Sequence, residues 1–401
     1  MKDTLPADPT FTPTREAGLD RLEAFLPRAG RTYAAERNHD RPGHDNVSTL
    51  SPWLRHRALT EAEVAGAVLE RFAPATAEKF LSEVVWRTYF KGHLERRPGL
   101  WDQYRRAVRA GQDRLATESG MRKGWEAACE GRTGIAPFDD WAAELARTGY
   151  LHNHARMWFA SIWIHTLGLP WALGADFFIR HLLDGDPASN TLSWRWVAGL
   201  HTNGKPYRAR ASNIAKYTDD RYDARTLGHQ LATEAPIPDA PPAPEPGPTP
   251  EGDSLPASGR IGLLLHEDDL HPDFLLARGL EPADVAVLIQ PQGRSPLTVA
   301  TQVRDFTRAL AEDAATRLDG TGPVTDDPAE IAAWAKGFDH LVAPHLPTGP
   351  VRDALAGTEL APLQPLRDWD AAAWPHAHAG YFKVKTKMPD IFEAIAADTG
   401  A

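Results

Sequence analysis

The chain has 401 residues, 42% of them hydrophobic, which is enough for two or three domains that each bury a core. No apolar run approaches the roughly twenty residues that span a membrane, and the single cysteine, Cys129, excludes an internal disulfide and a four-cysteine iron–sulfur cluster within one chain. The net charge of −10 divides into +4 for residues 1–230 and −14 for residues 231–401, so a polyanionic partner should bind the first part.

The first part of the chain has a helical pattern. Apolar residues recur at intervals of three and four, which is the spacing of one helix face. This spacing predicts helices over Ala62–Phe72, Ala75–Arg97, Trp101–Arg109, Phe138–Thr148, Asn153–Leu167 and Ala175–Leu183. Strand signals are scarce, so we expect an all-α domain over residues 1–230.

A proline-rich segment follows the helical part. Nine prolines lie between Pro236 and Pro256, mixed with alanine, glycine and glutamate. Such a composition is extended and partly stiff. We therefore expect a linker over residues 231–258 that divides the chain in two.

The pattern changes after the linker. Two continuous apolar runs have the character of buried parallel strands, and two later segments have helical spacing. The strands are expected at Arg260–Leu265 and Asp284–Ile289, and the helices at Ala300–Leu318 and Ala329–Phe338. Alternating strands and helices predict a Rossmann-like, doubly wound α/β domain over residues 259–401.

Small hydroxyl side chains gather in the segment Val47–Leu54, VSTLSPWL. Backbone N–H groups at the start of a helix lack internal partners and, with hydroxyl groups beside them, can hold a phosphate. The commoner explanation is that Ser51 only caps a helix. The segment alone leaves both interpretations open.

Glu83, Trp86 and Arg87 are spaced i, i+3 and i+4, so they share one face of a predicted helix. An acid, a flat aromatic ring and a guanidinium on one face can hold a planar polar ligand. The alternative is a buried tryptophan beside a Glu–Arg pair.

Asn153, Arg156 and Met157 repeat this spacing on another predicted helix. A buried arginine needs an acidic partner, because an unpaired interior charge is costly. Asp184 and Asp186, in the sequence Asp-Gly-Asp, are the candidates. Taken alone, that tripeptide is more typical of a surface turn.

These segments, in this order, resemble the photolyase/cryptochrome family. Val47–Leu54 is similar to its Ser-x-Leu-Ser-Pro-x-Leu element, and Phe80–Phe90 to its Glu-Leu-x-Trp-Arg-x-Phe pattern. The runs Gly149–Met157, Leu183–Asn190 and Trp194–Trp196 resemble its flavin-binding region, and Tyr33 with Arg37 a Tyr-x-x-x-Arg element. The matches follow the family's order over Tyr33–Tyr217. A helix cap, a buried ion pair and a surface turn each explain one segment, but they do not explain why all the segments occur in this order.

The resemblance implies FAD as the cofactor. It implies contacts from Tyr33, Ser48, Thr49, Leu50, Ser51, Arg87, Asn153, Arg156, Asp184, Asp186 and Asn190, with the diphosphate on Ser48–Ser51 and flavin N5 beside Asn190. Trp194 and Trp171 match the first two members of an electron relay to the flavin. The third relay position has no tryptophan, and Trp163, Trp158 and Trp125 are its candidates.

The resemblance also implies a binding site for a pyrimidine dimer in UV-damaged DNA. Glu83, Trp86, Asn153, Met157 and Trp196 match residues that surround a flipped-out dimer, and Arg37 matches a residue that can face DNA. The asparagine and methionine are typical of cyclobutane-dimer photolyases, whereas photolyases for the (6–4) lesion have histidines there. The chain departs from the family at His154 and Ala143, which replace arginines, and at Arg57, which replaces a glycine.

The order of the two parts is the reverse of the order in the family. Leu264–Leu276 resembles the opening strand of the family's antenna domain, and Gly380–Pro389 resembles the segment that follows that domain. We therefore expect a circular permutation, which a fold tolerates when its termini lie near one another. Glu267 and His271 replace arginines of the family's motif, which leaves an antenna chromophore in doubt.

The expected function is that of a cytoplasmic, FAD-dependent blue-light lyase that repairs cyclobutane pyrimidine dimers and requires no metal. Glu83, Asn190, Trp171 and Trp194 are its expected catalytic residues. Two alternatives are a cryptochrome-like photoreceptor without repair and a photolyase-like flavoenzyme acting on a small molecule. DNA affinity without salt dependence would favour the small molecule. The sequence leaves the oligomeric state open.

Overall fold

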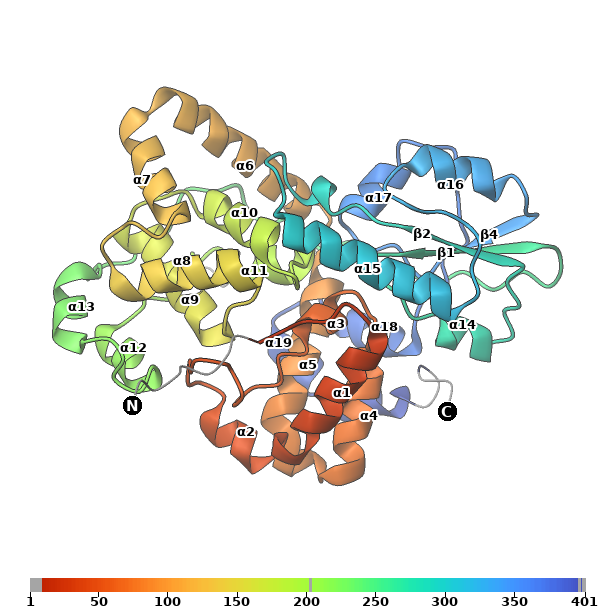
Figure 1. The fold of residues 1–401 in the computed structure, drawn as a ribbon, viewed down its shortest axis with the longest axis horizontal. Helices are drawn as coiled ribbons and strands as arrows, with labels where there is room; N and C mark the ends of the chain where they lie inside the picture. Colours follow the sequence, from red (N-terminus) through yellow and green to blue (C-terminus); the bar gives the residue numbers. More distant parts are fainter. Residues whose placement is uncertain (1–8, 202–203, 396–397, 399–401) are drawn as a thin grey trace.

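A computed structural model describes residues 9–201, 204–395 and 398. Up to Gln230 these residues form helices and connecting loops (Figure 1). The helices are α1 (Arg15–Phe25), α2 (Arg31–Glu36), α3 (Ser51–Arg55), α4 (Glu61–Arg71), α5 (Pro74–Glu95), α6 (Gly99–Thr117), α7 (Ser119–Cys129), α8 (Ala136–Thr148), α9 (Asn153–Ser161), α10 (Trp171–His181), α11 (Pro187–Val197), α12 (Ala211–Tyr217) and α13 (Ala224–Gln230).

The six predicted helices correspond to α4, α5, α6, α8, α9 and α10. The prediction over Asn153–Leu167 is corrected at its end, because α9 stops at Ser161 and continues as a single π-helical stretch, Ile162–Thr166. The other helices of this part were missed. Most are short, and the apolar positions of α1 are too few to form a helical pattern.

Two local signals explain why α4 and α5 begin where they do. The Oγ1 of Thr60 accepts a hydrogen bond from the Glu63 N–H at 3.1 Å, and Glu63 accepts one from the Thr60 N–H at 2.8 Å. This capping box starts α4. Pro74 occupies the first position of α5, where its missing N–H costs nothing.

The second part contains one parallel sheet. Its strands are β1 (Ile261–His266), β2 (Asp284–Leu288), β3 (Val324–Thr325) and β4 (His340–Val342), in the order β3-β2-β1-β4. Its helices include α14 (Asp273–Ala277), α15 (Thr301–Arg317), α16 (Pro328–Ala335) and α17 (Pro350–Leu355). Both predicted strands are present, whereas β3 and β4, of two and three residues, are too short for a sequence pattern to reveal.

Side chains on the two faces of the sheet enter different cores. Leu263 and Leu265 of β1 pack in the core that contains α15 and much of the helical part. Leu264 points to the opposite face, where it packs with residues of α16 and α17. The expectation of helical content together with a parallel sheet is confirmed.

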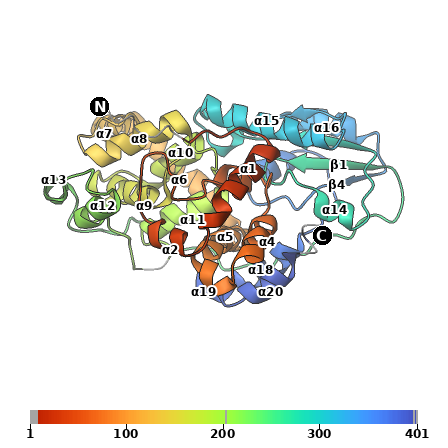
Figure 2. The same ribbon diagram turned by 60° about the horizontal axis from the view of Figure 1, so that its bottom comes forward.

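The last described helices do not cover the sheet. The helices α18 (Asp368–Ala373), α19 (Tyr381–Lys385) and α20 (Met388–Glu393) lie against α4 and α5 (Figure 2). Trp369 of α18 donates a hydrogen bond to Thr88 of α5 at 2.9 Å. These three helices of the range 259–401 thus pack on the helical part. The apolar surface of α5 is covered by the C-terminal aromatic side chains.

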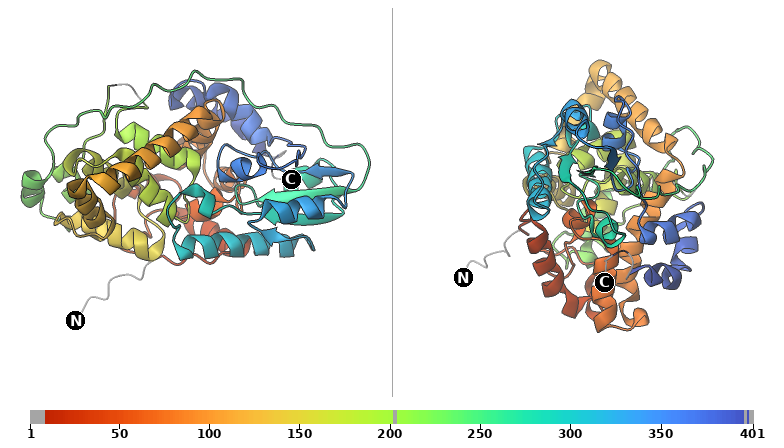
Figure 3. Two further views of the ribbon diagram at one scale, coloured as in Figure 1. Left: turned by 90° about the horizontal axis from the view of Figure 1, so that it is seen from above. Right: turned by 90° about the vertical axis from the view of Figure 1, so that its right-hand side faces the viewer.

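The proline-rich segment contains no helix or strand between residues 232 and 259, and it runs along the outside of the protein (Figure 3). It is nevertheless attached. Arg96, at the end of α5, accepts a hydrogen bond from the Gly247 N–H at 2.7 Å and donates one to the Gly247 carbonyl at 3.1 Å. Gln103 donates another to Pro242 at 2.9 Å. These contacts hold the segment against the start of α6.

Replacing Gly92 by valine is expected to displace the C-terminal helices. Even a Cβ atom at Gly92 would lie 2.5 Å from the Trp374 ring, so α5 and the segment before α19 could not keep their present approach. Such overpacking costs about 1–3 kcal/mol. Urea unfolding measures the loss. Gly120→Val is the matched control, because a Cβ there meets nothing within 4 Å.

Glu95 joins the end of α5 to the α/β part. Its carboxylate accepts hydrogen bonds from the Thr348 N–H and Arg352, both at 2.5 Å, and lies 3.1 Å from His345. Burial alone would raise the pKa of Glu95, but His345 and Arg352 lower it from 4.5 to about 2. The stabilisation is therefore complete above pH 4.5 and is lost as the pH falls towards 2.

The expected result is a stability difference that depends on pH. Glu95→Gln should be less stable than the wild type at pH 7 by about 3 kcal/mol, and the difference should shrink as the pH falls from 4.5 to 2. Urea unfolding at several pH values measures it. A difference that stays constant over this range would contradict the assignment.

Candidate flavin and substrate site

Arg156 and Asp184 form the ion pair that the sequence suggested. The Nη2 of Arg156 lies 2.9 Å from Asp184 Oδ2, and its Nε donates to the Leu151 carbonyl at 2.8 Å. The Asp184 side chain is only 6% exposed. Its second oxygen, Oδ1, is buried without a hydrogen-bond partner among the described residues. A buried carboxylate oxygen of this kind is costly unless a ligand or an ordered water pairs with it.

Two turns bring this pair together. Helix α8 ends at Gly149, whose φ of 70° is a left-handed conformation that glycine adopts readily. The Gly149 carbonyl then accepts a hydrogen bond from the Leu183 N–H at 2.9 Å. This bond joins the start of the α9 segment to the turn between α10 and α11. Arg156 and Asp184 are thereby placed side by side.

Asp186 lies on the other side of the same turn. It caps α11 by accepting a hydrogen bond from the Ser189 N–H at 2.7 Å, and it lies 3.5 Å from Arg87 and 4.0 Å from Lys91. Burial alone would raise the pKa of Asp186, but Arg87 and Lys91 lower it well below its usual range. Asp186 is therefore a buried anion between two cations.

The three residues spaced on one face of α5 each have a different protein partner. Glu83 pairs with Arg37, and Arg87 donates to Glu61 at 3.0 Å. Burial raises the pKa of Glu83. Trp86 stacks on another aromatic side chain, Tyr381 of α19. That Glu83 and Trp86 contact a substrate and Arg87 contacts a flavin stays a prediction.

The predicted phosphate cradle is partly engaged by the protein itself. Thr49 has a φ of 50°, and its hydroxyl accepts a hydrogen bond from Arg21 at 3.0 Å while donating to the Ser48 carbonyl at 2.8 Å. Ser51 is the first residue of α3 and Leu50 is its N-cap, so Ser51 does not cap the helix.

Two other predicted cofactor residues are buried at the edges of this region. Asn190 donates a hydrogen bond to the Ala175 carbonyl at 2.8 Å, which fixes its amide between α10 and α11. Tyr33 packs between Phe25 and Phe80, and burial raises its pKa strongly.

Predicted substrate residues border a cavity of about 660 Å³ at the start of α9 and α12. Met157 lines it, and Asn153 lies exposed one turn earlier at the start of α9. Trp196 stacks on Tyr207 with ring centroids 5.4 Å apart. The full lining is His154, Met157, Pro206, Tyr207, Arg208, Arg210, Asn213 and Ala235.

Trp194 and Trp171, the predicted relay residues, have different aromatic neighbours. Trp194 is buried, and its ring contacts in the described structure are with Phe159, Trp163 and Phe178. The Trp163 centroid lies 6.2 Å away. Trp171 instead contacts Tyr104 at 6.1 Å. The neighbour of Trp194 is thus Trp163, one of the three candidates for the third position, rather than Trp171.

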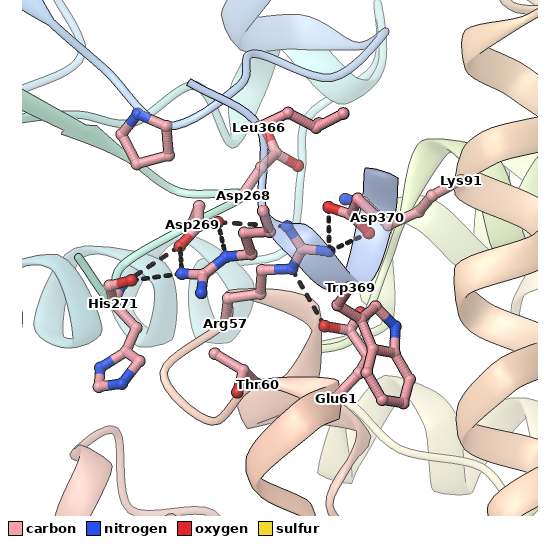
Figure 4. A network of polar contacts seen from close by, with 12 residues as sticks. Arg57, Thr60, Glu61, Lys91, Asp268, Asp269, His271, Leu366, Trp369 and Asp370 are labelled. Atoms are coloured by element: carbon pink, nitrogen blue, oxygen red, sulfur yellow. Dashed lines mark hydrogen bonds and ion pairs between the residues drawn. The ribbon is translucent and has the colours of Figure 1, made fainter. Parts of the chain in front are cut away.

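A buried ion network was missed in the sequence (Figure 4). Arg57 lies 3.1 Å from Glu61, 3.2 Å from Asp269 and 2.8 Å from Asp370, so it joins α4 to the loop after β1 and to α18. Its φ of 45° is left-handed, which favours glycine. The sequence contained one sign of this network, namely that Arg57 replaces a glycine of the family.

The carboxyl end of β1 is also filled with paired charges. Glu267 follows β1 and lies 3.2 Å from Arg55 and 2.9 Å from Arg294, and all three side chains are fully buried. Ligands of parallel sheets usually bind at this end of the strands. Here protein side chains occupy that place, which agrees with leaving an antenna chromophore in doubt.

The described ranges contain neither a candidate metal site nor a candidate membrane-spanning helix. Their histidine, cysteine, aspartate and glutamate side chains form no group of three or more that could hold a metal ion. None of the helices described by the structure is both long and apolar enough to span a membrane.

Residues 80–226 match the family model for the FAD binding domain of DNA photolyase. The predicted resemblance to the photolyase/cryptochrome family is thereby confirmed over residues 80–226, which are similar to the FAD binding domain of DNA photolyase. Deoxyribodipyrimidine photo-lyases are among the similar proteins. The enzyme of Streptomyces griseus is 34% identical over 211 residues, which are 52% of this chain and 44% of the relative. The enzyme of Thermus thermophilus is 34% identical over 207 residues, which are 50% of this chain and 46% of the relative.

The chain thus spans less than half the length of these relatives. Among solved structures, a bacterial class III photolyase from Agrobacterium tumefaciens is 28% identical with a TM-score of 0.45, covering 54% of this chain and 46% of that one. A Synechocystis cryptochrome is 24% identical with a TM-score of 0.45, covering 53% and 45%.

The residues present fit a flavin. The unpartnered Oδ1 of Asp184 needs a hydrogen-bond donor, and the N–H of an isoalloxazine ring is one. The cations Arg87 and Lys91 lie on the other side of the same turn, at Asp186. These features suit a cofactor that carries both a polar ring and phosphates.

Proposed function

We propose that this chain is an FAD-dependent blue-light lyase that splits cyclobutane pyrimidine dimers in DNA. The observation that carries the proposal is the Arg156–Asp184 pair with its unpartnered oxygen, inside a segment that matches a photolyase FAD-binding domain. The names of the relatives indicate the same activity. A circular permutation of the family's domain order and a cytoplasmic location are part of the proposal.

When bound, FAD would supply light-driven electron transfer to the dimer. Arg156 would orient Asp184 so that Oδ1 can accept a hydrogen bond from the flavin, and Asn190 would present its amide near the ring. Trp194 and Trp163, with centroids 6.2 Å apart, would provide a buried path for electrons. Thr49 and its neighbours would hold the diphosphate.

The cavity beside Met157 would receive the DNA. Among the described residues that line it are Arg208, Arg210 and a histidine and no acidic residue, so its charge suits a phosphate backbone. Tyr207 and Met157 supply apolar surface for a base. The acidic second part of the chain would face away from the strand.

Repair under blue light tests the proposal. The full chain, loaded with FAD and photoreduced, is illuminated with an oligothymidylate that carries one thymine dimer, and restored thymine absorbance near 260 nm is followed. We expect repair in light and none in the dark. Asp184→Asn should lose repair together with FAD, whereas Asp219→Asn, at an exposed ion pair, should keep both. FAD-loaded wild-type protein that repairs nothing in light would refute the proposal.

One observation favours the photoreceptor alternative. The flat face of Trp86 is already stacked on a protein side chain, Tyr381, so it is not open to a base. A photoreceptor would need no such opening. It would show a light-dependent change in the contact between α5 and α19 without repair, which hydrogen exchange in light and dark would detect.

A further inference from the structure

Tyr381 of α19 occupies the position on Trp86 that a flipped-out base would need. The two rings are almost parallel, with centroids 3.7 Å apart and an interplanar angle of 8°. Figure 2 shows helices α5 and α19, which carry Trp86 and Tyr381. That separation is the thickness of a stacked base, so no base fits between them. Next to Trp86 on its own helix are Tyr89 and Phe90, at 5.5 and 5.3 Å.

Several contacts hold Tyr381 in this place. Its side chain is 5% exposed, and its hydroxyl donates a hydrogen bond to the Ser82 carbonyl of α5 at 3.0 Å. Lys385, one turn later, pairs with Glu78 of α5 at 2.6 Å. Val384 between them is fully buried. The stack is therefore a built contact between α19 and α5.

One side of α19 is open. Gly380 precedes it in open space, since a Cβ there would meet nothing within 4 Å. The next residue, Phe382, is 76% exposed, so the helix has one ring directed inward and one outward. Only five residues form this helix, between the buried Trp374 and the buried Ile391.

We infer that Tyr381 is an intramolecular competitor that closes the Trp86 face until a damaged base displaces it. The inference rests on the proposed function, because it concerns the same substrate site. Binding then requires the conformation in which the Tyr381 ring has moved away, and the apparent affinity is reduced by the rarity of that conformation. Stacked, well-paired bases cannot offset this cost, whereas a poorly stacked dimer can.

The test measures binding in the dark by the full chain loaded with FAD. The probe is a fluorescent single-stranded oligothymidylate that carries one thymine dimer. Tyr381→Ala should bind it about tenfold more tightly than the wild type, because base–aromatic stacking no longer competes with the tyrosine. Tyr381→Phe keeps the ring and should remain within about threefold, since it loses only the bond to Ser82. Phe382→Ala, the matched control on the exposed side, should not change the affinity.

A second substitution shows where the gain arises. Trp86→Ala should abolish the gain when it is added to Tyr381→Ala, because the base then has no ring at this position on which to stack. If Tyr381→Ala does not fold, Tyr381→Leu retains apolar volume without a flat ring and should give the same gain.

The outcomes separate the two proposals. If Tyr381→Ala binds the probe no more tightly than the wild type, or if Phe382→Ala gains as much affinity, the inference that Tyr381 competes with the base would be wrong. The proposal that DNA is the substrate would remain. Absence of binding in every variant would overturn the proposed function and the competitor with it.

Discussion

Arg156→Ala is expected to lose FAD almost completely, with an affinity at least about a hundredfold below that of the wild type. The substitution leaves the buried carboxylate of Asp184 without its cation. Breaking one side of a buried ion pair costs about 3–5 kcal/mol, and each 1.4 kcal/mol is about tenfold in affinity. The ratio of absorbance at 450 and 280 nm after gel filtration, followed by titration with FAD, measures the loss.

The control is an arginine of similar size on the surface. Arg114 of α6 pairs at 2.7 Å with Glu118, the residue after that helix, and both side chains are about half exposed. Such pairs contribute about 0–1 kcal/mol, so Arg114→Ala should keep its FAD. Unchanged FAD retention in a folded Arg156→Ala protein would remove this pair from the cofactor site.

Arg57→Gly is expected to destabilise the protein by about 3 kcal/mol, although glycine suits the backbone better. The left-handed φ of Arg57 costs about 1 kcal/mol, which glycine would recover. Against this, the substitution leaves three buried carboxylates without their shared cation, and the loss of such a partner costs about 3–5 kcal/mol. Urea unfolding at pH 7 measures the net change.

The three carboxylates are not equally affected. Glu61 retains Arg87 at 3.0 Å and Asp269 retains Arg367 at 2.7 Å, whereas the ion pair recorded for Asp370 is with Arg57. Adding Asp370→Asn to Arg57→Gly should therefore restore part of the stability. Arg278→Ala, which breaks a surface pair with Asp368, should cost less than about 1 kcal/mol. A stabilised Arg57→Gly protein would mean that backbone strain outweighs the network.

Sequence patterns predicted the long elements well, because each carries several turns of regular apolar spacing. Helix α5 and strands β1 and β2 are examples. Helices α18 to α20 were not predicted. Each has five or six residues, too few for a period to appear, and their positions depend on tertiary contacts with α5.

Some contacts of the candidate site could be predicted from the sequence and others could not, for a similar reason. The Arg156–Asp184 pair followed from an unpaired charge and nearby acids, a requirement that the sequence contains. The occupation of Trp86 by Tyr381 did not follow, because these residues are almost three hundred positions apart and no local rule relates them. The partners of Arg57 were hidden in the same way, since two of the three come from the second part of the chain.

The packing of α18, α19 and α20 on α5 has a consequence for biosynthesis. A ribosome completes α5 long before it reaches these helices, so Thr88, Gly92 and the apolar side chains around them emerge without their covering. Nascent chains with such exposed surface are prone to aggregation and bind chaperones. The packing around α5 is therefore completed only after residues 368–393 have been synthesised.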